Sequence, residues 1–101
     1  MILVLTTTEK KSLAQKIGNA LLKEKLVACA SILPMESSYW WKGKIVNAQE
    51  FQLILKTKPE NFAKIEKVIK KLHTYELPEI ISININKAGK DYLTWIEKEI
   101  D

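Results

Sequence analysis

The sequence predicts a single α+β domain, residues 1–101, built around an antiparallel sheet. Short apolar and β-branched runs alternate with two amphipathic helical patterns, in the order strand, helix, strand, strand, helix, strand, and a further short helix follows. The 101 residues are 47% hydrophobic, which supports one small core and leaves no room for a second domain. The first six elements follow the split β-α-β, or ferredoxin-like, order, in which both helices cover the same face of the sheet.

The first half of the chain supplies a strand, a helix and a second strand. Residues 2–7 are a short apolar and β-branched run that predicts a buried strand. An apolar stripe recurs at helical spacing over residues 10–25, with most lysines outside it. Residues 26–33 predict the second strand, and the strand pattern continues again over residues 37–41. Pro34 interrupts this strand, which indicates an edge position or a bulge.

Gly43 separates the second strand from the third. A glycine takes the positive φ angle of a tight hairpin without steric strain, so this segment predicts a turn. Residues 45–57 then alternate apolar and polar side chains, which predicts a half-buried strand. At its end, Thr57 and Glu60, with Pro59 between them, have the spacing of a capping box and predict the start of a helix.

The remaining elements complete the pattern. Apolar residues at helical spacing over residues 62–72 predict a second amphipathic helix, and residues 73–79 predict a loop. Isoleucines alternate with serine and asparagine over residues 80–86, which predicts the fourth strand. Tyr92 and Trp95 belong to the apolar face of a short terminal helix.

The composition excludes several classes of function. The chain has 16 basic residues, all of them lysine, and 12 acidic residues, for a net charge of +4. Without arginine it lacks the usual bidentate group for phosphate and for guanine, so no nucleic-acid partner is expected. The lysines are expected on solvated helix faces, and the bias toward lysine, glutamate and isoleucine fits a thermostable protein.

No membrane partner, disulfide or catalytic motif is expected. The apolar stretches are far shorter than the ~20 residues that cross a bilayer, and residues 1–5 do not resemble a signal peptide, so the expected location is cytoplasmic. A single cysteine, Cys29, excludes an internal disulfide and is expected to be a packed thiol. No serine lies in a nucleophile elbow and the three glycines are dispersed, so the chain is not expected to be an enzyme.

The hairpin formed by residues 26–41 and 45–57 is too long for the domain that carries it. Each strand spans roughly 40–50 Å at about 3.3 Å per residue, whereas a domain of this size is about 33 Å across. The tip therefore projects and carries Tyr39, Trp40 and Trp41, which we expect to be buried against another copy of the chain. Alternatively, the second strand ends at Pro34 and the tryptophans fold back onto the sheet.

Two groups of residues are candidates for binding. His73 lies at the predicted end of the second helix, where it either caps the helix or contributes one ligand of a weak metal site with Glu76, Glu79 or a neighbouring chain. Lys56, Tyr75 and Glu79 are expected near one end of the sheet. There they bind a small anion, or they form a surface ion pair with the tyrosine packed over the lysine stem.

Five segments resemble one known family in order and spacing: Leu26-Val27-Ala28-Cys29-Ala30, Tyr39-Trp40-Trp41-Lys42-Gly43-Lys44-Ile45, Ile54-Leu55-Lys56-Thr57, His73-Thr74-Tyr75-Glu76-Leu77-Pro78-Glu79-Ile80 and Tyr92-Leu93-Thr94-Trp95. They look like the CutA-type divalent-cation tolerance proteins, and the match covers almost the whole chain. The resemblance implies a ferredoxin-like fold, a homotrimer, and tolerance of copper and other divalent cations without established catalysis or an organic cofactor.

The resemblance also implies which residues take part. Metal assignments in the family rest on a cysteine at the end of the first strand and on histidines at the end of the second helix. Here those positions hold Thr6 and Leu72-His73, so only His73 carries over. Lys56, Tyr75 and Glu79 match family positions that line a cleft between subunits. We therefore expect a trimeric protein that binds divalent metal ions weakly, or, alternatively, a trimeric sensor of a small ligand.

Overall fold

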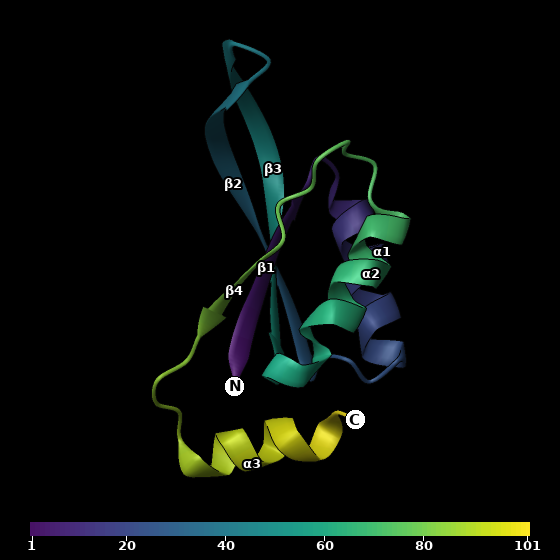
Figure 1. Ribbon diagram of the computed structural model, residues 1–101, viewed down its shortest axis with the longest axis vertical. Coiled ribbons are helices and arrows are strands. Elements are labelled where there is room, and N and C mark those ends of the chain that lie inside the picture. Colours follow the sequence, from purple (N-terminus) through teal and green to yellow (C-terminus); the bar gives the residue numbers. More distant parts are fainter.

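An antiparallel sheet of four strands forms the frame of the protein, with the strand order β2-β3-β1-β4 (Figure 1). The computed structural model describes residues 1–101. Its elements are β1 (Ile2–Thr8), α1 (Lys11–Lys23), β2 (Cys29–Trp41), β3 (Lys44–Thr57), the 3₁₀ turn η1 (Pro59–Asn61), α2 (Phe62–Leu72), β4 (Ile81–Asn84) and α3 (Lys90–Glu99). This order and pairing confirm the predicted ferredoxin-like fold and the additional terminal helix.

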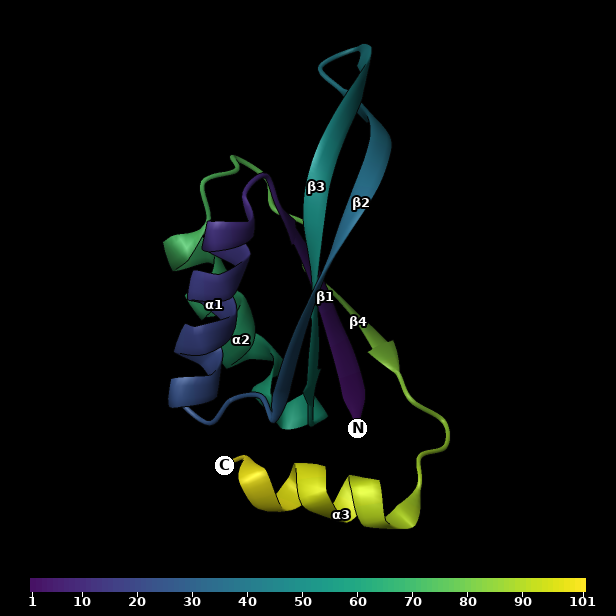
Figure 2. The same cartoon turned by 180° about the vertical axis from the view of Figure 1, so that it is seen from behind.

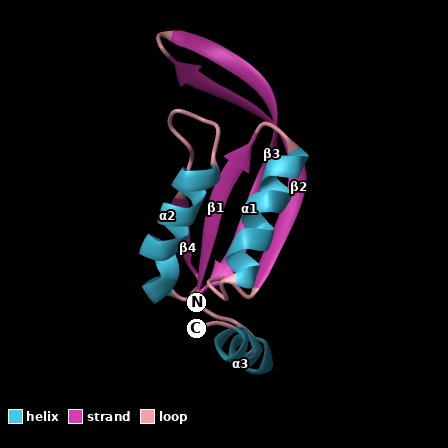
Figure 3. Ribbon diagram, turned by 90° about the vertical axis from the view of Figure 1, so that its right-hand side faces the viewer, coloured by secondary structure: helices cyan, strands magenta, loops and turns pink.

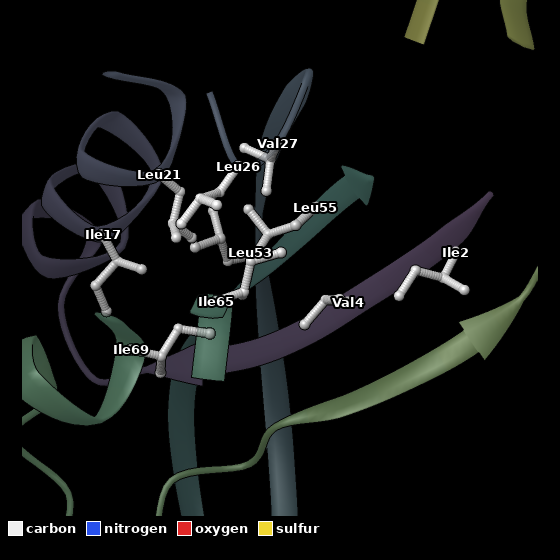
Figure 4. Close-up of a cluster of buried hydrophobic side chains, with 10 residues drawn as sticks. All are labelled: Ile2, Val4, Ile17, Leu21, Leu26, Val27, Leu53, Leu55, Ile65 and Ile69. Carbon is white, nitrogen blue, oxygen red and sulfur yellow. The ribbon is translucent and has the colours of Figure 1, made fainter. Parts of the chain in front are cut away.

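Helices α1 and α2 lie side by side on one face of the sheet, as predicted (Figures 2 and 3). Between them and the sheet lies a core of ten buried residues, shown in Figure 4: Ile2, Val4, Ile17, Leu21, Leu26, Val27, Leu53, Leu55, Ile65 and Ile69. Helix α1 approaches β2 closely at Gly18, where an added Cβ atom would lie 3.2 Å from the Cβ of Ala30. Packing on this face explains the helical apolar stripes in the sequence.

The predicted capping box at Thr57 is wrong. Thr57 is still the last residue of β3, and its hydroxyl donates a 2.6 Å hydrogen bond to the carbonyl of Leu26. The next residues form the 3₁₀ turn η1, and neither η1 nor α2 has a side-chain N-cap bond. The side-chain amide of Asn61 also donates to the Leu26 carbonyl, at 3.1 Å, and to the carbonyl of Asp101, at 3.3 Å. These polar residues therefore join β3 to two other segments instead of capping a helix.

The β2–β3 hairpin extends well beyond the rest of the sheet, which confirms the predicted projection (Figure 1). The molecule measures 45 × 26 × 21 Å. Strand β1 pairs with β3 only from Phe51 onward, so residues 35–50 pair with each other alone, and we call them the arm. Pro34 lies within a continuous β2 at the edge of the sheet, so the alternative in which the strand ends there is not observed.

The face of the sheet opposite the helices has no covering layer within the chain. Leu33, Ile81 and Ile83 are exposed on it, in register with residues of β3 and β1 whose side chains also point away from the core. Helix α3 crosses the end of the sheet farthest from the arm and buries Ile96 (Figure 2). An apolar area of this kind on a small protein indicates an interaction surface.

Candidate functional site

The imidazole of His73 is held by two hydrogen bonds at the end of α2. Its Nδ1 accepts the backbone N–H of Tyr75 at 2.9 Å, so Nε2 carries the ring hydrogen and donates it to the carbonyl of Thr7 at 2.6 Å. The backbone N–H of His73 completes the helix by donating to Ile69 at 2.8 Å. The predicted position at the helix end is confirmed, and the ring fastens the following loop to β1. A metal ion would reach either ring nitrogen only after one of these bonds breaks.

The loop after His73 crosses to the other face of the sheet and covers the carboxylate of Glu50. The phenol of Tyr75 donates a 2.8 Å hydrogen bond to Glu50 Oε2, and Glu50 is only 5% exposed. Burial raises the pKa of the Tyr75 phenol, and the hydrogen bond and negative charge of Glu50 act in the same direction. Tyr75 is therefore a neutral donor throughout the physiological range, and it does not neutralise the buried carboxylate.

A second carboxylate, that of Glu79, lies close to Glu50. The side-chain amide of Gln52 donates to Glu79 Oε2 at 3.3 Å. Burial raises the pKa of the Glu79 carboxyl above its usual value, and the charge of Glu50 raises it further. The two carboxylates thus repel each other. This arrangement favours any positive group that can lie between them.

These groups line an open hollow of about 800 Å³ between the arm and the loop that joins α2 to β4. In Figure 3 the arm curves over that loop, and at its tip Lys42 pairs with Glu76 at 3.8 Å. We call this space the acidic hollow, and its lining includes Ser37, Tyr39, Trp41, Glu50, Tyr75 and Glu79. The arm thus supplies Tyr39, Trp41 and the carboxylate of Glu50, and the loop supplies Tyr75 and the carboxylate of Glu79.

Lys56 does not lie at the acidic hollow within one chain. It is four residues from Gln52 along β3, about 13 Å at the usual rise of a strand. Its ammonium donates a 3.0 Å hydrogen bond to the hydroxyl of Tyr92 on α3, which raises the pKa of Lys56. Directly across on β2 is Cys29. One chain therefore brings Tyr75 and Glu79 together and places Lys56 elsewhere, and a meeting of all three between subunits stays a prediction.

The predicted metal ligands do not form a chelating group within the chain. No three histidine, cysteine, aspartate or glutamate side chains come close enough together to hold a metal ion. Glu76 is largely exposed in its ion pair with Lys42, and both ring nitrogens of His73 have partners. A tight site with three or four protein ligands is therefore not built by these residues of one chain.

Sequence reasoning missed Glu50 and Gln52. Both belong to the polar half of an alternating strand, and that pattern assigned them to solvent. Burial of Glu50 depends on the loop after α2, whose path no local pattern indicates. The only sequence signal for a functional Glu50 was its place in a strand of the hairpin whose tip carries aromatic residues.

Together the fold and the site define a small ferredoxin-like α+β protein with one acidic, aromatic-walled hollow. The family model of the CutA1 divalent ion tolerance protein matches residues 2–99, so the chain belongs to this family. The divalent-cation tolerance protein CutA of Archaeoglobus fulgidus is 41% identical over 88 residues, covering 87% of this chain and 86% of the relative. That of Pyrococcus horikoshii is 40% identical over 99 residues, covering 98% and 97%.

The fold also agrees closely with a solved structure. The A. fulgidus protein, described as a periplasmic divalent cation tolerance protein, superposes with a TM-score of 0.97 at 37% identity, with both chains covered completely. Membership of the family supports a role in divalent-cation tolerance. None of the helices in this chain has the length and apolar character needed to span a bilayer. The cytoplasmic location stays a prediction.

Proposed function

We propose that this protein serves divalent-cation tolerance as a non-enzymatic homotrimer that binds divalent ions, copper among them, weakly. The observation that carries the proposal is the pair of carboxylates, Glu50 and Glu79, that face the acidic hollow with no lysine nitrogen in ion-pair contact. A divalent ion relieves the repulsion between them. Glu76, on the same loop, also lines the hollow and is in an ion pair with Lys42, which must open before Glu76 can bind a metal ion.

Binding is expected to be weak because one chain offers few ligands. Among calcium sites, affinity depends on the number of charged ligands and on the rigidity of the site, and the weakest have dissociation constants of about 10⁻⁴–10⁻³ M. Additional ligands come from a neighbouring chain in this proposal, which makes occupancy depend on assembly. His73 joins the ligand set only if its bond to Tyr75 or to Thr7 opens.

Calorimetric titration with Cu²⁺ and with Zn²⁺ tests the metal site. We expect weak binding that Glu79→Gln reduces at least several-fold and that Glu97→Gln, on the exposed face of α3, leaves unchanged. A His73→Ala variant that titrates like the parent removes His73 from the ligand set. The absence of any binding heat with either ion at millimolar concentration would refute the metal-binding part of the proposal.

The trimer is supported by two apolar areas that one chain leaves open. The uncovered sheet face carries Leu33, Ile81 and Ile83, and Trp40 on the arm is 72% exposed. Three copies related by a threefold axis cover both areas with one repeated contact. Light scattering coupled to size-exclusion chromatography is expected to give the mass of three chains, and the mass of one chain at micromolar concentration would contradict this.

A second function, sensing a small molecule, is favoured by the size of the acidic hollow. At about 800 Å³ it is large for a bare ion and falls within the range of small-molecule sites, roughly 300–1,000 Å³. Native mass spectrometry of the protein purified from its own cells tests this function. A bound organic molecule supports it, and its absence together with unaltered metal binding leaves the metal function alone.

A further inference from the structure

The carboxylates of the acidic hollow lack a positive partner. Glu50 is 5% exposed and receives a hydrogen bond only from the neutral phenol of Tyr75, and Glu79 receives one only from the neutral amide of Gln52. The ion pairs of the chain are Lys42–Glu76 and Lys70–Glu66, and neither involves these carboxylates. A carboxylate as buried as that of Glu50 is ordinarily paired with a cation because desolvation of an unpaired charge is costly. Glu79 is more exposed, and its charge adds to the negative potential of the hollow.

Aromatic side chains line the same hollow as the two carboxylates. Tyr39 and Trp41 come from the arm and Tyr75 from the loop. The faces of such rings attract ammonium and guanidinium groups. Trp41 already has one such neighbour, since the ammonium of Lys42 lies 5.7 Å from its ring centroid. Hydrated metal ions gain little from an aromatic wall, whereas an organic cation contacts it with both its charge and its carbon chain.

A polar atom without a partner also lies in the lining. The hydroxyl oxygen of Ser37 is buried and makes no hydrogen bond within the chain. Buried hydroxyls almost always have a partner, so the chain by itself leaves this hydroxyl without a bond that a group from outside the chain can supply. An ammonium or guanidinium offers several N–H donors in addition to its charge.

From these observations we infer that the acidic hollow binds a small organic cation, a primary ammonium or guanidinium compound. Its charged nitrogen lies between Glu50 and Glu79, its carbon chain lies against Tyr39 and Trp41, and a remaining N–H donates to Ser37. This inference rests on the sensing function proposed above and names the chemistry of its ligand. Glu50 and Glu79 are the binding residues in it, and the arm determines the length of ligand that fits.

The test is titration of the assembled protein with 1,4-diaminobutane and with agmatine, followed by calorimetry and by tryptophan fluorescence. Both probes are expected to bind saturably, at one site per chain, and to change the tryptophan emission. n-Butanol, which has the carbon chain without the charge, is expected not to bind. Glu79→Gln is expected to weaken binding about tenfold or more, since a charge-assisted hydrogen bond is lost. Glu97→Gln, with the same change of charge on α3, is expected to bind like the parent.

Glu50→Gln is a second test, because its carboxylate is buried and the amide retains a bond to Tyr75. If thermal melting shows that this variant is unfolded, two other variants test the site. Glu79→Gln tests the carboxylates, and Trp41→Leu tests the aromatic side chains. Failure of both probes to bind the parent overturns the inference. A lysine of another copy that already occupies the hollow would have this result. Equal binding by Glu79→Gln and the parent, or binding of n-butanol as tight as that of the amines, also overturns it.

The outcomes separate this inference from the proposed metal function. Binding of Zn²⁺ without binding of either amine leaves the metal function standing and rejects the organic cation. Binding of the amines without heat from Zn²⁺ or Cu²⁺ supports the organic cation and rejects weak metal binding.

Discussion

Replacing Tyr75 by phenylalanine is the sharpest test of how the site is built. The substitution removes only the hydroxyl that donates the 2.8 Å hydrogen bond to Glu50 and leaves the ring against His73 in place. Glu50 is 5% exposed, so water does not replace the lost donor without rearrangement. A hydrogen bond to a charged group contributes about 1.5–3 kcal/mol. We expect Tyr75→Phe to lower the free energy of unfolding by this amount at neutral pH.

The assay is denaturant unfolding at fixed protein concentration, because an assembled protein has a concentration-dependent stability. Tyr92→Phe is the matched control. It removes a hydroxyl that accepts a 3.0 Å bond from Lys56 in an exposed position, and we expect a change within about 1 kcal/mol.

The double variant Tyr75→Phe, Glu50→Gln shows whether the cost comes from the charge. An amide is cheaper than a carboxylate to bury without a donor, so Glu50→Gln is expected to recover part of the loss. If Tyr75→Phe changes stability by less than about 0.5 kcal/mol, as a surface substitution does, then burial of the Glu50 carboxylate does not depend on this bond.

Three further substitutions follow from the geometry. Glu79→Gln is expected to stabilise the unliganded protein at neutral pH. Because the pKa of Glu79 is raised, the folded protein favours the protonated carboxyl. The contribution of this carboxyl to stability is complete below its unfolded pKa and is lost as pH rises through its folded pKa. The advantage of Glu79→Gln over the parent is therefore expected at neutral pH and vanishes in acid. Asn61→Ala is expected to cost about 1–3 kcal/mol in denaturant unfolding, because a buried amide that joins Leu26 to the C-terminus is lost. Trp40→Lys is expected to weaken the proposed trimer in sedimentation without lowering helical circular dichroism, since this indole is 72% exposed in one chain.

Each of these has an outcome that contradicts it. A stability difference between Glu79→Gln and the parent that grows toward acidic pH has the opposite pH dependence. It would show that repulsion from Glu50 does not destabilise the parent at neutral pH. An Asn61→Ala variant as stable as the parent shows that Thr57 alone satisfies the Leu26 carbonyl. A Trp40→Lys protein that remains trimeric at nanomolar concentration places the arm outside the interface.

Element order was predictable because each element has its own local periodicity. Alternation along β3 and the helical stripes of α1 and α2 arise from burial on one side, and that burial is recorded in the spacing of apolar residues. The length of the β2–β3 hairpin was predictable for a similar reason, since the rise per residue of a strand is constant. The capping-box prediction at Thr57 was wrong because threonine is equally suited to two positions. It occurs as the N-cap of a helix, and it also occurs as the last residue of a strand, where its hydroxyl is buried.

The acidic hollow depends on contacts between segments distant in sequence. Tyr75 meets Glu50 across 25 positions, and Gln52 meets Glu79 across 27, through a loop whose path is determined by the hydrogen bonds of the His73 ring. By itself, the sequence determined the order of elements, the projecting arm and the family, because these follow from local spacing and motifs. Only the tertiary structure decided that Glu50 is buried, that Tyr75 and Glu79 share its surroundings and that Lys56 does not, because side-chain neighbours depend on sheet register and on the course of a loop.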